Sequence, residues 1–265
     1  MNTKSNRRKL ITSGCSFTEP PYTWPTFLAE ELYTLNTDYK WDLYNVGLGS
    51  QGNGLIRKKL IYQIEKLIKT HDPSDMFVGV MWSGVDRHHF RHSDSNLLNN
   101  EPYDGWSRNP TSVTPNNNNW YIINSHWESK HAKQWYKYFH DNTNSVIMTL
   151  EDIHYTQLYL ENYGIPYFMT TYMDIFGNLG KLHELFNDEI AEDILNHPDV
   201  TYLYESINWN SFLDVGGCLE WLYENHPTNG LPDINGWYKH PTQDGHQLFT
   251  QEVIVPHLKD KMDYL

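Results

Sequence analysis

The sequence predicts an α/β fold, a three-layer α/β/α sandwich around a central, mostly parallel sheet. Two observations carry this prediction. Short apolar runs alternate with longer stretches of helical periodicity, and the 265 residues contain no internal repeat and no clear linker. Strands separated by helices pair in parallel and are covered on both faces. The length suits one large domain better than two small ones, so we expect a single domain over residues 1–265.

Five apolar runs predict the strands of this sheet. Each is short and rich in β-branched, aromatic or other apolar residues, as buried strands are. The predicted strands are Lys9–Ser13, Trp41–Val46, Asp75–Trp82, Ile165–Tyr172 and Val200–Leu203.

Stretches with apolar residues every three or four positions predict the helices. In the clearest stretch, Leu60, Ile64 and Leu67 lie near one face. Pro25 is tolerated in the first turn of a helix, and Gly164 predicts a C-cap. The predicted helices are Trp24–Leu35, Leu55–Thr70, Ser129–Phe139, Ser145–Tyr163, Leu179–Asn196 and Gln243–Lys261.

The alternating pattern fails between His88 and Trp127. This stretch contains repeated Asn residues, including the run Asn116–Asn119, together with Gly and Pro. It predicts a long irregular insertion at about 88–127. Loops of this length usually cover a site or carry a function.

The composition excludes several classes of partner. A net charge of −13 argues against binding to nucleic acid or to an anionic membrane surface, because both carry negative charge. No apolar run is long enough to span a bilayer. Aromatic residues make up 15% of the chain, and their large rings suit both a core and stacking on sugar rings. The oligomeric state is not predicted.

Cofactors and metals are not expected. Cys15 and Cys218 do not have the number or spacing of a disulfide framework or a zinc site. His88 and His89 are adjacent and point apart in most backbones, which argues against a metal site. The polar N-terminus lacks the apolar segment of a signal peptide, so we expect synthesis in a cytosol.

Four polar segments lie where the sites of parallel sheets form, beyond the carboxyl ends of the strands. Three follow predicted strands and the fourth precedes the last predicted helix. The segments are Ser13–Thr18, Asn45–Asn53, Trp82–Arg87 and His240–His246.

The first and fourth segments carry a nucleophile and a base. Ser16 lies on a tight turn after a strand, where its hydroxyl can project and its amide can face a developing oxyanion. A helix-capping loop is the alternative. Pro241 keeps His240 extended, and Thr242 is a good N-cap that fixes the loop against a helix. The triplet that begins at His226 imitates this segment, but no strong helix follows it.

The order of the four segments resembles the SGNH (GDSL-like) hydrolase family. Gly14-Cys15-Ser16 is similar to its G-D-S block, and Asn45–Asn53 resembles its glycine block. Gly84–Arg87 resembles its G-x-N-D block, and His240-Pro241 matches the end of its D-x-x-H-P block. The resemblance spans nearly the whole chain on few residues and implies a flavodoxin-like sandwich.

This resemblance implies roles for individual residues. Ser16 is the implied nucleophile and His240 its base. The implied oxyanion hole consists of the Ser16 amide, the amide of Gly49 or Ser50, and residue 86. Beside these segments, we expect the side chains of Trp82, Arg87 and Trp237 to contact the substrate.

Two departures from the family pattern affect the chemistry. Trp237 occupies the position of the family's third triad residue, so either the site works as a Ser16–His240 dyad or Asp233 completes a triad across the flexible Asn235-Gly236 loop. Asp86 occupies the position of the oxyanion-binding Asn. Its carboxylate must be protonated or turned away, or the register of this block is shifted by one residue, and Ser83 or Arg87 then serves as the donor.

Two functions follow from this pattern. The first is a serine esterase that removes acyl groups, with an O-acetylated glycan as the leading substrate because Trp106, Trp120 and Trp127 of the insertion can stack on sugars. The second is a catalytically decayed binding or structural protein on the same fold. The Asn-, Trp- and Tyr-rich composition suggests a virus particle as its setting. A nucleotide-binding enzyme is the third interpretation, but no phosphate-binding lysine follows the glycines.

Overall fold

The computed structural model describes residues 6–92, 119–123, 130–175, 188–231 and 240–261. Five parallel strands form the central sheet in the order β2-β1-β3-β6-β7. Their bounds are β1 Arg7–Gly14, β2 Lys40–Asn45, β3 Met76–Trp82, β6 Tyr167–Thr171 and β7 Phe212–Gly217. All five strands therefore present their carboxyl ends at one edge of the sheet, which is where the four polar segments were expected.

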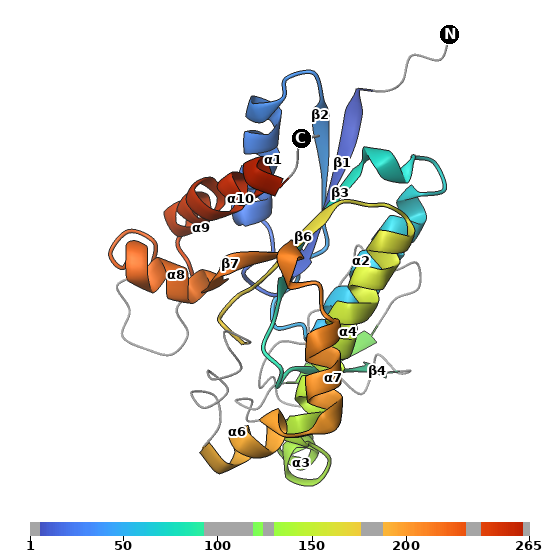
Figure 1. Cartoon of the computed structure of the whole chain (residues 1–265), viewed down its shortest axis with the longest axis vertical. Coiled ribbons are helices and arrows are strands. Elements are labelled where there is room, and N and C mark those ends of the chain that lie inside the picture. The colour runs from blue at the N-terminus through green and yellow to red at the C-terminus, as the bar shows by residue number, and fades with distance from the viewer. Residues whose placement is uncertain (1–5, 93–118, 124–129, 176–187, 232–239, 262–265) are drawn as a thin grey trace.

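Helices cover both faces of this sheet (Figure 1). One layer contains α2 (Asn53–Leu67), α4 (Asn142–Asn162), α6 (Asp188–Leu195) and α7 (Pro198–Ser206). The other contains α1 (Trp24–Leu35), α8 (Cys218–Asn225), α9 (Gln243–Phe249) and α10 (Val255–Lys261), with a π-helical turn at Thr250–Ile254 between the last two. The predicted three-layer α/β/α sandwich is confirmed.

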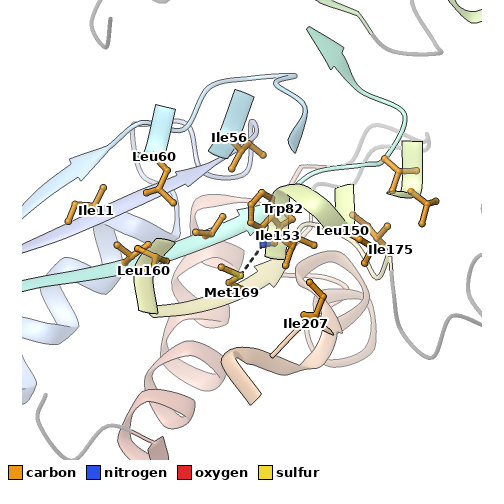
Figure 2. Close-up of a cluster of buried hydrophobic side chains, with 14 of the residues drawn as sticks. Ile11, Ile56, Leu60, Trp82, Leu150, Ile153, Leu160, Met169, Ile175 and Ile207 are labelled. Atoms are coloured by element: carbon orange, nitrogen blue, oxygen red, sulfur yellow. Dashed lines mark hydrogen bonds between the residues drawn. The ribbon is translucent and has the colours of Figure 1, made fainter. Parts of the chain in front are cut away.

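Alternate side chains of the strands build two separate cores. Leu10 packs with the α1 and α9 layer, whereas its neighbour Ile11 packs with the α2 and α4 layer. Figure 2 shows the core on the α2 and α4 side of the sheet, where Leu60 and Leu160 lie near Ile11. Because each strand is buried on both faces, it reads as a continuous apolar run rather than an alternating one.

Most predicted elements lie within a few residues of those observed. The helix α1 has the predicted bounds, and the strands β1, β2, β3 and β6 lie at the predicted runs. Gly164 follows α4 in the left-handed region, with φ of 63°, as its C-cap role requires. The helix predicted over Leu179–Asn196 is described only from Asp188 onward, as α6.

The prediction of a strand at Val200–Leu203 is wrong, because these residues belong to α7. His197 is its N-cap and Pro198 its first residue, a combination that starts a helix despite the β-branched residues that follow. The fifth strand is β7 instead, and both it and α8 were missed. Glycines at the end of β7 and Asp214 within it weaken its strand pattern.

The predicted insertion contains a two-stranded antiparallel ribbon that the sequence did not reveal. Strand β4 (His88–His92) pairs with β5 (Asn119–Ile123), and α3 (Lys130–Tyr138) follows. The ribbon begins directly after the polar segment at the end of β3, so the insertion starts beside the expected site. Among the described helices, none is both long and apolar enough to cross a membrane.

Candidate active site

The hydroxyl of Ser16 and the imidazole of His240 meet at the carboxyl edge of the sheet. Ser16 Oγ lies 2.7 Å from His240 Nε2, although 224 positions separate the residues in the chain. Ser16 lies on the turn after β1, and His240 lies just before α9. A hydroxyl and an imidazole at hydrogen-bonding distance are the arrangement in which a histidine can remove the serine proton.

A rigid turn holds His240 in place. Thr242 is the N-cap of α9, and its hydroxyl accepts a hydrogen bond from the Gly245 amide at 2.9 Å. The same hydroxyl donates to the Asn229 carbonyl at 2.8 Å, and the Thr242 amide donates to the Gly230 carbonyl at 2.9 Å. The predicted N-cap is confirmed, and it fixes the loop that carries the imidazole.

The turn that carries Ser16 requires glycine at position 14. A Cβ atom on Gly14 would lie 2.1 Å from Thr18 Oγ1 and 2.8 Å from the Met81 carbonyl oxygen. The turn closes through bonds from the Thr18 and Glu19 amides to the Cys15 carbonyl, at 2.9 and 3.1 Å. This closed turn leaves the Ser16 side chain half-buried at the edge of the sheet.

The glycine loop after β2 supplies the neighbouring backbone amides. The Gly49 amide donates to Glu19 Oε2 at 3.1 Å. In the described part of the chain, the Ser50 amide donates to no acceptor, and neither does the Ser16 amide. Of the two candidate donors in this loop, Ser50 is therefore the one available to an oxyanion.

Ser50 also has the backbone conformation of a glycine. Its φ is 63°, in the left-handed region that a side chain disfavours. We expect Ser50→Gly to raise the free energy of unfolding by about 1 kcal/mol, because glycine removes this strain. Chemical denaturation measures the change. A lower stability would contradict this assignment, since it would mean that the serine side chain stabilises the loop.

Asp86, the third candidate for the oxyanion hole, lies on a tight turn after β3. A Cβ atom on Gly84 would lie 2.9 Å from Asp86 Oδ1, so the carboxylate folds back over its own turn. The Tyr136 hydroxyl donates to the Asp86 carbonyl and ties α3 to this turn. The same added Cβ atom would lie 3.3 Å from the Tyr172 hydroxyl, so the turn at Gly84 packs against the residue that follows β6.

Arg87, the residue after Asp86, is half-buried. Its guanidinium carbon is 5.1 Å from the centre of the Tyr172 ring. Burial acts to lower the Arg87 pKa, but interactions with Cys15, Tyr172 and Asp86 raise it overall. Its Nη1 atom is shielded from solvent and has no hydrogen-bond partner in the described part of the chain. Arg87 therefore lies against the Tyr172 ring, and its expected contact with substrate stays a prediction.

Comparisons with known proteins find similar folds at low sequence identity. Neither a protein-family profile nor a curated protein sequence matches the chain. Among solved structures, a variant of an acetyl xylan esterase from Geobacillus stearothermophilus is 13% identical with a TM-score of 0.46, over 95% of this chain and 94% of that one. TesA is 10% identical with a TM-score of 0.48, over 96% of this chain and 99% of that one. The acetyl xylan esterase AlAXEase is 14% identical with a TM-score of 0.47, again over 96% and 99%.

The expectation that Trp82 contacts substrate is wrong. Its side chain is fully buried, and its indole Nε1 faces Met169 Sδ at 3.4 Å within the core (Figure 2). Ser83 is also fully buried, so its hydroxyl does not face a substrate either. Its backbone instead exchanges two hydrogen bonds with the Asn53 side chain, at 2.8 and 3.1 Å. Asn53 thus joins α2 to the end of β3, while Gly52 is the N-cap.

Two predicted site residues, Asp233 and Trp237, lie outside the described residues. Phe17 and Tyr172 were not predicted to belong to the site. The Phe17 ring lies 5.0 Å from the His240 ring and 5.2 Å from the Tyr172 ring, measured between centres. Tyr172 directly follows β6, so applying the strand-end rule to that strand as well would have found it.

A cavity of about 740 Å³ opens at the opposite, amino end of the strands. Its lining includes Arg8, Trp41, Met76 and Tyr167, which lie at or near the starts of four strands. Neither Ser16 nor His240 contributes to it, so the two reactive side chains lie away from this hollow. Within the described ranges, no group of three or more His, Cys, Asp or Glu side chains is placed to hold a metal ion.

Proposed function

We propose that this chain is a serine esterase of the SGNH type, with Ser16 as nucleophile and His240 as general base. The observation that carries the proposal is the 2.7 Å separation of Ser16 Oγ and His240 Nε2. The segments that bring these atoms together also occur in the order that resembles the family. The proposed reaction is hydrolysis of an ester in two steps, through an acyl-enzyme.

In the first step, Ser16 Oγ attacks the ester carbonyl carbon while His240 Nε2 accepts the hydroxyl proton. The negative charge that develops on the carbonyl oxygen is stabilised by the amides of Ser16 and Ser50. When the intermediate collapses, the C–O bond to the alcohol breaks and the protonated imidazole gives its proton to the leaving oxygen. Water then attacks the acyl-serine with His240 again as base, which releases the acid and restores the serine.

A single observation favours the second candidate function, a non-catalytic binding protein on the same fold. Asp86 occupies the place where the family has an oxyanion-binding Asn, and an ionised carboxylate there would repel the developing oxyanion. Its side chain folds back over Gly84, however. An active site with a carboxylate at this position requires such an arrangement, because the charge must be turned away from the oxyanion. The two candidates differ in whether an ester is turned over.

We extend the proposal to an O-acetylated glycan as substrate. The insertion starts beside the site, and its sequence contributes Trp106, Trp120 and Trp127, which can stack on sugar rings. The test is acetate release from an acetylated oligosaccharide, compared with hydrolysis of p-nitrophenyl acetate. We expect kcat/KM to be at least about tenfold higher for the oligosaccharide, because stacking adds binding energy. Hydrolysis of the small ester alone would contradict the glycan assignment, and hydrolysis of neither would favour the binding protein.

A further inference from the structure

The nucleophile turn and the glycine loop are joined by several hydrogen bonds. The Asn45 side-chain amide donates to the Thr18 carbonyl at 2.6 Å, and the Leu48 amide donates to the Gly14 carbonyl at 3.2 Å. The Gln51 side-chain amide also donates to the Gly14 carbonyl. These bonds join the base of the loop to the turn, so the two segments form one unit.

The bond from Gly49 to Glu19 differs from these in its acceptor. The others end on backbone carbonyls, whereas the Gly49 amide donates to a carboxylate oxygen, at 3.1 Å. Hydrogen bonds to charged acceptors are stronger than neutral ones and hold their geometry more tightly. The donor, Gly49, directly precedes Ser50, whose amide is the proposed oxyanion donor. The acceptor, Glu19, lies three residues after the nucleophile Ser16.

A buried lysine lies near the Glu19 carboxylate. Lys59 is 3% exposed on α2. Burial lowers its pKa to about 8, and the charge of Glu19 acts in the opposite direction. A buried ammonium is costly unless an opposite charge compensates it, so the Glu19 charge favours the charged form of Lys59.

We infer that Glu19 is a positioning residue: its carboxylate holds the Gly49 amide and thereby orients the Ser50 amide toward the oxyanion. The inference rests on the proposed function, to which it adds a residue outside the family pattern. A blocking role for Glu19 is the competing interpretation, because a carboxylate on a loop amide also resembles a bound oxyanion. Positioning and blocking predict opposite changes in kcat when the carboxylate is removed.

The experiment compares p-nitrophenyl acetate kinetics of wild type, Glu19→Ala and Glu19→Gln. We expect Glu19→Ala to lower kcat about tenfold with KM within about twofold, because a displaced donor weakens transition-state binding more than substrate binding. Glu19→Gln keeps a carbonyl acceptor for the Gly49 amide and should recover most of the loss. Glu30→Gln on the exposed face of α1 removes the same charge elsewhere and should leave kcat unchanged.

Hydrogen exchange of the peptide containing residues 48–51 provides a second readout that does not depend on activity. We expect faster exchange in Glu19→Ala than in wild type or Glu30→Gln. An unchanged or increased kcat in an active Glu19→Ala variant would overturn the inference, and so would unchanged exchange. An inactive wild type would contradict the proposed function instead, and exchange alone would then decide whether Glu19 anchors the loop.

Discussion

Replacing His240 by alanine is expected to lower kcat for an acetyl ester by at least about a thousandfold. The imidazole lies 2.7 Å from Ser16 Oγ, so its loss leaves the hydroxyl without a base and the leaving alcohol without a proton donor. KM should change little, because the small ester does not need the imidazole for binding. Steady-state kinetics with p-nitrophenyl acetate measure both parameters.

The chain contains a matched control for this variant. His226 also precedes a proline and a threonine, but its Nε2 lies 3.0 Å from Glu252 Oε2, at the end of α8. We expect His226→Ala to keep kcat within about twofold of wild type, since this side chain hydrogen-bonds Glu252 away from Ser16. Equal losses in the two variants would show that the His-Pro-Thr segments matter for stability and not for catalysis.

The second large effect is a gain of activity on replacing Asp86 by asparagine. An uncharged amide at this position can donate to the oxyanion and no longer repels it. One oxyanion-hole donor is worth about a hundredfold in kcat, so a gain of up to about that size is expected. Asp38→Asn, in an exposed turn, makes the same chemical change away from the site and should have no effect.

An unchanged kcat in Asp86→Asn would show that residue 86 does not face the reacting carbonyl. Its carboxylate would then stay folded over Gly84, where the structure places it. In that case the amides of Ser16 and Ser50 would form the whole oxyanion hole among the described residues. A lower kcat would contradict the assignment, because it would mean that the negative charge assists the reaction.

The pairing of Ser16 with His240 was predictable because the residues around each one fix a local structure. A glycine turn after an apolar run and an N-cap before a helix are both set by nearby residues. Three histidines in this chain precede prolines, at positions 197, 226 and 240. The capped final helix was enough to select His240, and the topology of a parallel sheet then brings the two segments to one edge.

The direction of side chains at the strand ends was less predictable. All seven residues of β3 are buried, so the strand shows no alternation from which to read which face Trp82 occupies. Only the three-dimensional structure shows that its indole lies in the core, beside Met169 of β6. The role of Glu19 depends on contact with a loop thirty positions away, which no local pattern reveals.

The strand predicted at Val200–Leu203 failed for a different reason. β-branched residues favour strands only weakly, and the capping residues at His197 and Pro198 outweighed them. The strand β7 was missed because it lies at the edge of the sheet, where partial exposure permits polar residues and glycine. Short edge elements carry the weakest sequence signal in this fold.

Covalent labelling by a fluorophosphonate, followed by mass mapping of the modified peptide, tests directly whether Ser16 and His240 form a reactive pair. This reagent reacts with a serine hydroxyl that an adjacent base has activated. We expect one label per chain, on Ser16, and none in Ser16→Ala or His240→Ala. An unlabelled wild type, or a label that persists after Ser16 is replaced, would contradict the assignment of Ser16 and His240 as the reactive pair.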